Sequence, residues 1–142
     1  MKVSKDFELG EFIDPATWMV RGEKSIELID NRLITLTQFF RDYFAVPITI
    51  NNWHTNGQYQ ESGLRTFLSK TGATYSQHKY GRAADLKLTG IEPEEVRAEI
   101  RRNWTAFKKA GLTCIEKDTP TWVHIDVRNT TSPEILYEVA YK

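Results

Sequence analysis

Two short stretches, each with one histidine, constrain the fold of this chain more than any other feature. The first runs from Ser76 to Asp85 (Ser-Gln-His-Lys-Tyr-Gly-Arg-Ala-Ala-Asp), and the second is Trp-Val-His-Ile-Asp around His124. Of the three histidines in the chain, two stand in these stretches, and Asp85 follows His78 by seven residues. Two imidazoles and one carboxylate are therefore available to a metal ion. Three protein ligands with an open fourth position are typical of catalytic zinc, whereas structural zinc sites usually have four protein ligands.

The pattern Ser-x-His-x-x-Gly-x-Ala-x-Asp, followed by a distant Trp-Val-His-x-Asp, resembles the zinc-dependent D-Ala-D-Ala carboxypeptidases, of the peptidase M15 type. That family includes phage endolysins that cut peptidoglycan stem peptides, and it shares its fold with the hedgehog signalling domain. The resemblance is strong over residues 62–128 and weak elsewhere. The fixed positions of the first motif are all filled, by Ser76, His78, Gly81, Ala83 and Asp85.

The resemblance implies roles for five side chains. It assigns His78, Asp85 and His124 as ligands of Zn²⁺, and a peptidoglycan peptide as the substrate. In that family an arginine in a Ser-Gly-x-Arg setting lines the substrate cleft, and Arg65 occupies this setting here. A guanidinium group offers a rigid fork that holds a carboxylate or polarises a carbonyl oxygen. Ser76 is assigned as a second substrate-binding residue.

The expected general base is the main departure from the family. Amide hydrolysis needs a group that takes the proton of the attacking water. Many members place a glutamate three residues before the final histidine, where this chain has Thr121. Asp118 (six residues before His124) and Glu116 (eight before) are the two nearby acids that could replace it. The spacing of six also occurs in the hedgehog branch, so Asp118 is slightly preferred and Glu116 is retained.

Asp126 follows His124 by two residues, on the same strand face. Zinc-bound histidines usually donate their second N–H to a carboxylate or a carbonyl group. Asp126 is therefore expected to orient a ligand.

Composition predicts one ordinary globular domain over residues 1–142, with 40% hydrophobic and 27% charged residues. No apolar run approaches the roughly 18 residues of a membrane span. The 19 basic and 19 acidic residues cancel, which argues against a dedicated nucleic-acid binder. We expect a monomer that binds a peptide-like partner, without nucleic acid or membrane.

The first ten residues contain basic residues but no apolar run behind them, so no secretory signal is expected. The protein is then made in the cytoplasm. It would reach a substrate in the periplasm or cell wall through cell lysis or another export route.

Apolar periodicity predicts two main helices. Apolar residues recur at steps of three and four across residues 25–44. Pro93 opens a second helix that runs to about Ala110, with acidic residues in its first turn and basic residues in its last. Its charged run, residues 97–102, is expected to face solvent. Residues 1–24 are expected to be irregular, apart from a helical turn with Asp14 as its cap.

Strands are predicted at residues 47–50, 84–88, 112–116 and 122–128, with a further short element within residues 134–140. Alternation in the fourth strand places Val123, Ile125 and Val127 on the core face, and Trp122, His124 and Asp126 on the cleft face. The single cysteine, Cys114, is expected to be a buried strand residue.

The polar segment of residues 51–74 is long for a loop, which favours a functional role. His54, which lies in it, is expected at the surface or beside the site. The predicted fold class is α+β: a small, mostly antiparallel sheet with two main helices packed on it and the zinc cleft on the opposite side.

These features together predict a zinc metallopeptidase that hydrolyses peptidoglycan stem peptides. The bond is D-Ala-D-Ala or L-Ala-D-Glu, and a phage or prophage lytic enzyme fits a small single domain. The alternative is a hedgehog-like or phage structural module that binds zinc without turnover, which Thr121 at the usual glutamate position favours.

Overall fold

A computed structural model, which describes residues 1–141, has a five-stranded sheet at its centre. The order is β1-β2-β4-β3-β5, and neighbours are antiparallel except β3 and β5, which are parallel. The predicted α+β class with a mostly antiparallel sheet is thereby confirmed. The strands are β1 (Ile48–Thr49), β2 (Ala83–Leu88), β3 (Cys114–Glu116), β4 (Val123–Asp126) and β5 (Tyr137–Val139).

Every predicted strand is present, and most are shorter than predicted. In β4 the alternation holds, because Val123 and Ile125 join the hydrophobic core while His124 faces Asp85 on the other side. Cys114 is fully buried in β3, as expected.

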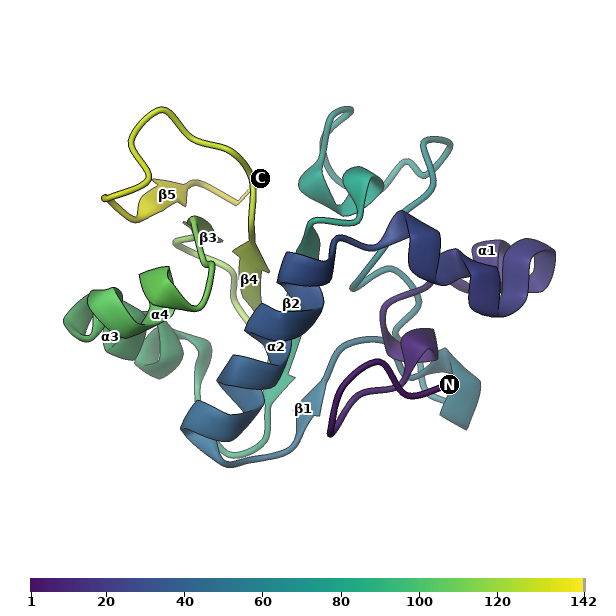
Figure 1. Cartoon of the computed structure of the whole chain (residues 1–142), viewed down its shortest axis with the longest axis horizontal. Coiled ribbons are helices and arrows are strands. Elements are labelled where there is room, and N and C mark those ends of the chain that lie inside the picture. The colour runs from purple at the N-terminus through teal and green to yellow at the C-terminus, as the bar shows by residue number, and fades with distance from the viewer. Residues whose placement is uncertain (142) are drawn as a thin grey trace.

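Helix α2 (Asn31–Phe44) covers one face of the sheet (Figure 1) and buries an apolar stripe that includes Leu33, Leu36 and Phe40. The prediction of a helix from residue 25 is wrong at its start, because Gly22–Leu28 form a 3₁₀ helix, η2. Asp30 then caps α2, accepting the backbone N–H of Arg32 at 2.9 Å. A side-chain oxygen that satisfies a free N–H at this point starts a new helix.

The second predicted helix is also divided. It forms α3 (Pro93–Arg102) and α4 (Trp104–Lys109), separated by Asn103 with φ −117° and ψ 42°. The Asn103 side chain donates to the Tyr43 hydroxyl at 2.9 Å. Val96 of α3 and Phe107 of α4 both reach the core. The Phe107 ring lies 4.8 to 5.3 Å from the rings of Tyr43, Phe40 and Phe39.

The N-terminal region is more ordered than predicted. It contains η1 (Leu9–Glu11) and α1 (Pro15–Arg21), and Asp14 caps α1 as expected, accepting the N–H of Thr17 at 3.0 Å. It also contributes four fully buried core residues: Phe7, Leu9, Phe12 and Ile13. Within the described part of the chain, no helix has both the length and the apolar character required to cross a membrane.

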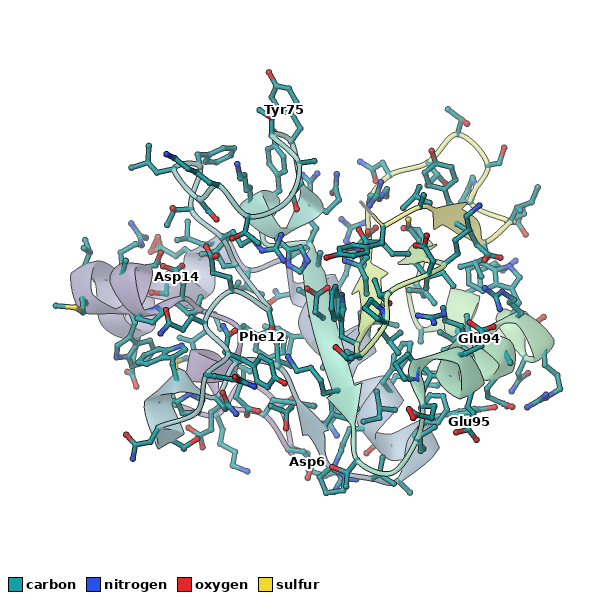
Figure 2. All side chains as sticks on the ribbon, turned by 180° about the vertical axis from the view of Figure 1, so that it is seen from behind. Asp6, Phe12, Asp14, Tyr75, Glu94 and Glu95 are labelled. Atoms are coloured by element: carbon teal, nitrogen blue, oxygen red, sulfur yellow. The ribbon has the colours of Figure 1, made fainter. Side chains whose placement is uncertain are left out.

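Two groups of loops rise on either side of the end of β2 and β4 (Figure 1). One includes the short helix η4 (Gln77–Tyr80), and the other leads into β5, whereas the short helix η3 (Trp53–Thr55) lies near the N-terminus. Figure 2, from behind, shows the sheet face that α2 leaves uncovered, with Tyr75 at the tip of the first loop group. The space between the two groups is where the functional side chains meet.

Gly81 joins the first motif to the body of the fold. Its φ is +69°, and a Cβ there would lie 1.9 Å from the Leu28 carbonyl oxygen. Gly81 also accepts the backbone N–H of Asp30 at 3.0 Å. Only glycine allows both the left-handed conformation and this approach of two backbones.

We expect Gly81→Ala to cost about 3 kcal/mol or more of unfolding free energy, since it combines a strained φ with a backbone clash. Gly90→Ala is the matched control, because Gly90 has φ +79° with no atom within 4 Å of the added Cβ. It should cost only about 1 kcal/mol. Urea unfolding of both variants measures the difference, and equal losses would contradict the proposed clash.

Candidate metal centre

Three side chains from two adjacent strands and one short helix meet at the floor of the cleft. Asp85 lies on β2 directly opposite His124 on β4, and His78 comes from η4. One ligand atom from each residue lies within 4.8 Å of the others, and all three residues are buried. The structure thus brings together the three residues predicted to bind the metal.

His78 owes its position to the local structure of the motif. Ser76 caps η4, with its hydroxyl accepting the backbone N–H of His78 at 3.2 Å, and Gly81 ends the helix. This turn places the imidazole next to β2. Ser76 also lines the cavity above the cluster.

The hydrogen bonds around the two imidazoles define how they face each other. Nδ1 of His78 lies 2.8 Å from the Gly63 carbonyl oxygen, and Nε2 of His124 lies 2.7 Å from Oδ2 of Asp126. Each of these nitrogens donates its proton outward to an oxygen. The other ring nitrogens, Nε2 of His78 and Nδ1 of His124, lie 3.2 and 3.1 Å from Oδ1 of Asp85.

Three lone-pair donors therefore converge on one point. Neutral imidazoles held in this way have no proton to offer Asp85, so the arrangement calls for a positive charge at its centre. Two imidazole nitrogens and a carboxylate oxygen suit a divalent transition metal. The His78, Asp85 and His124 group could hold such an ion.

The electrostatics of the cluster agree with this geometry. Burial alone would raise the pKa of Asp85, but His78 and His124 hold that pKa far below its usual value. Burial would lower the pKa of His124, yet its hydrogen bonds to Asp126 and Asp85 raise it to about 10. In the absence of a metal ion, a proton on His124 supplies the positive charge.

Arg65 belongs to the same cluster, through its backbone and its side chain. Its N–H donates to the His78 carbonyl at 3.1 Å, and its guanidinium Nη2 lies 3.3 Å from Oδ2 of Asp85. Arg65 also lines the cavity. It therefore contacts the ligand set directly and presents its guanidinium beside it.

The structure separates the two candidate general bases. Glu116 lines the cavity with Oε1 3.7 Å from Nδ1 of His124, and burial raises its pKa while His124 opposes the rise. Asp118 stands on the following turn, where its carboxylate accepts the backbone N–H of Tyr141 at 2.6 Å. Asp118 is not among the residues that line the cavity, whereas Thr121 is.

The cavity has a volume of about 980 Å³. One wall comes from residues 58–62, Arg65, residues 71–73 and residues 75–77, and the other from Thr121, Trp122, Arg128 and residues 139–141. The Trp122 and Tyr141 rings pack edge to face at 5.1 Å in the second wall. The polar segment of residues 51–74 thus contributes to the cleft. His54 is exposed and packs on Trp53, outside the metal cluster.

Lys87 also lines the cavity, two residues after Asp85 on the same face of β2. Its ammonium group donates to the Ile50 carbonyl at 2.7 Å and to the Ser62 hydroxyl at 2.8 Å, and lies 3.9 Å from the centre of the Tyr59 ring. Burial lowers the pKa of Lys87 to about 8, while the negative charge of Asp85 opposes this shift.

Arg97 is a structural residue, and the prediction that it faces solvent is wrong. Its side chain is buried and donates to the side chain of Thr119 at 2.8 Å and to its carbonyl at 3.2 Å. These bonds fix the turn between β3 and β4, which carries Thr121 and Trp122 into the cavity. The one indication in the sequence that Arg97 is buried is its place directly after Val96, which is itself buried.

Comparison with known proteins gives one match. The family model of peptidase M15 matches residues 17–126, a span that includes His78, Asp85 and His124. No curated protein and no solved structure matches the chain.

Metal affinity should depend on pH in a defined direction. With a His124 pKa of about 10 in the metal-free protein, an incoming ion must displace a proton, so affinity for Zn²⁺ should rise about tenfold per pH unit between pH 7 and 9. Asp126→Asn removes the carboxylate that raises this pKa, so the affinity of the variant should rise less steeply with pH than that of the wild type. Competition with a chelator of known pH dependence measures both effects. A pH-independent affinity in the wild type would contradict the proton displacement.

Proposed function

The chain belongs to the peptidase M15 family, and on that premise we propose that it is a zinc-dependent peptidase that hydrolyses stem-peptide bonds of peptidoglycan. Membership of the family implies a metallopeptidase that acts on peptides. The observation that carries the proposal is the convergence of three metal-binding atoms, from His78, Asp85 and His124, at the floor of a cavity.

The donor set favours zinc in a catalytic form. Two imidazole nitrogens and one carboxylate oxygen would supply three protein ligands, the number typical of catalytic zinc, which keeps one position for water or substrate. When bound there, zinc lowers the pKa of water toward neutrality and polarises a substrate carbonyl group. Gly63 and Asp126 orient the two imidazoles for this task.

Glu116 is the general base in this proposal. Its carboxylate lies next to His124 and faces the cavity, and its raised pKa brings proton exchange closer to neutral pH. It takes a proton from the water that attacks the scissile carbonyl carbon, and it delivers that proton to the leaving nitrogen when the C–N bond breaks. Thr121 lines the cavity but cannot accept a proton in this way.

Arg65 is proposed to bind the substrate. Its guanidinium lies beside Asp85 in the cavity, within reach of a carbonyl oxygen that becomes negatively charged during attack. Ser76 holds η4 and lines the same wall, so we assign it to the substrate side of the cleft.

The proposed substrate class rests on the motif resemblance. Peptide bonds of D-Ala-D-Ala or L-Ala-D-Glu type are the two candidates. We propose that the protein is a lytic enzyme of a phage or prophage, which reaches the cell wall when the cell lyses.

One preparation tests this function. The native and chelator-treated proteins are compared for bound zinc and for cleavage of purified peptidoglycan, and mass spectrometry identifies the fragments. Stoichiometric zinc and cleavage that stops with the chelator are expected, and the fragment masses identify the bond. Stoichiometric zinc without cleavage of walls of different chemotypes would favour the alternative, a zinc-binding module without turnover.

A pair of isosteric variants tests the general base. Glu116→Gln should lower kcat about 100- to 10,000-fold with zinc content unchanged, because it removes the proton acceptor but not a ligand. Asp118→Asn is the matched control and should retain activity within a few-fold, since Asp118 binds the Tyr141 backbone outside the cavity lining. The reverse result would assign the base to Asp118.

A further inference from the structure

Three arginine and lysine side chains line the cavity, and two of them have a carboxylate partner. Arg65 lies 3.3 Å from Asp85, and Arg128 lies 2.6 Å from Asp126. The third is Lys87, and within residues 1–141 no carboxylate lies at ion-pairing distance from its ammonium group. It is the cavity cation whose charge the described structure leaves uncompensated.

The contacts of Lys87 are with neutral groups. Its ammonium touches the Ile50 carbonyl, the Ser62 hydroxyl and the face of the Tyr59 ring. These groups position the charge without neutralising it. Taking a charged group out of water without a counter-ion costs free energy, and a methionine of similar length would avoid this cost. A substrate anion that enters the cavity would compensate the charge.

The position of Lys87 indicates which part of a substrate would meet it. Asp85 and Lys87 are two residues apart on β2, so their side chains share the cleft face with Cα atoms roughly 7 Å apart. An extended peptide advances about 3.3 to 3.6 Å per residue. An anion one or two residues from the metal-bound end of a substrate is therefore within the range of the ammonium.

We propose that Lys87 binds the free α-carboxylate of the residue that follows the scissile bond. This inference rests on the proposed peptidase function and deepens it, because both candidate bonds supply such a group. The terminal residue of D-Ala-D-Ala has a free carboxylate. In L-Ala-D-Glu the stem peptide continues through the γ-carboxyl group of D-Glu, so its α-carboxylate is also free. Lys87 thus favours substrates whose leaving residue is negatively charged, and the Tyr59 ring lies beside the ammonium group of Lys87.

Matched peptides test this assignment. In the first pair, the acid is acetylated L-Lys-D-Ala-D-Ala and the amide is the same peptide with an amidated C-terminus. In the second pair, the acid is L-Ala-D-Glu joined through its γ-carboxyl group to L-Lys, and the amide is the same peptide with D-isoglutamine in place of D-Glu. The pair whose acid form the wild type cleaves is used. The wild type should prefer the acid about 10- to 100-fold in kcat/KM, mainly through KM. Lys87→Met should abolish the preference by slowing the acid alone, and Lys87→Arg should restore part of it.

Controls separate this role from a structural one. Lys109→Met removes a lysine that is exposed on α4 and should leave the preference intact. Zinc affinity and the thermal midpoint are measured for every variant. If Lys87→Met weakens zinc binding and slows both peptides equally, then Lys87 only holds the loop at Ser62, and the assignment is overturned.

The wild type alone also gives a decisive comparison, which does not depend on whether a variant folds. Equal cleavage of acid and amide would overturn the carboxylate subsite while leaving the peptidase intact. Cleavage of neither acid peptide, with zinc bound, would overturn the proposed function and this assignment with it.

Discussion

Residues 62–65 hold two of the three candidate metal ligands through four contacts, and the rest of the site depends on them. The Ser62 carbonyl accepts the backbone N–H of Asp85 at 2.7 Å, and the Gly63 carbonyl accepts the His78 ring at 2.8 Å. Arg65 adds its N–H to the His78 carbonyl and its guanidinium to Asp85. Because a loop has no sheet ladder of its own, these bonds set its position relative to β2 and thereby the geometry of the ligands.

That loop is in turn fixed to the N-terminal region, which explains why an apparently irregular lead-in is so deeply buried. The N–H of Leu64 donates to the Phe12 carbonyl at 2.8 Å. The side-chain amide of Asn51 donates its N–H to the Ile13 carbonyl, and its oxygen accepts the backbone N–H of Ser62. A Cβ on Gly63 would lie 2.5 Å from the Phe12 carbonyl oxygen. The glycine of the Ser-Gly-x-Arg setting is thus explained by the close approach of two backbones rather than by contact with substrate.

The sequence predicted the parts of the site that local spacing determines. The seven-residue step from His78 to Asp85, and the strand alternation around His124, depend on neighbouring residues alone. The choice between Glu116 and Asp118 does not, because it depends on the register of β3 against β4. The register that pairs Cys114 with Asp126 places Glu116 across from His124. That register is stabilised by a turn that Arg97 reaches from a distant helix, and no local pattern contains this information.

Around the candidate metal site, each arginine pairs with a carboxylate, and each carboxylate contacts an imidazole nearer the centre of the site. Arg128 binds Asp126 on the side away from the metal-binding atoms, and Asp126 binds His124. Arg65 likewise contacts Oδ2 of Asp85, which leaves Oδ1 to face the two imidazoles. Each arginine offsets a buried carboxylate without occupying the central point, so a divalent cation added there leaves the cavity floor positively charged. With Lys87 on the same face, we expect that excess charge to attract an anionic ligand, so the proposed preference for an anion rests on the same arrangement of charges that surrounds the candidate metal site.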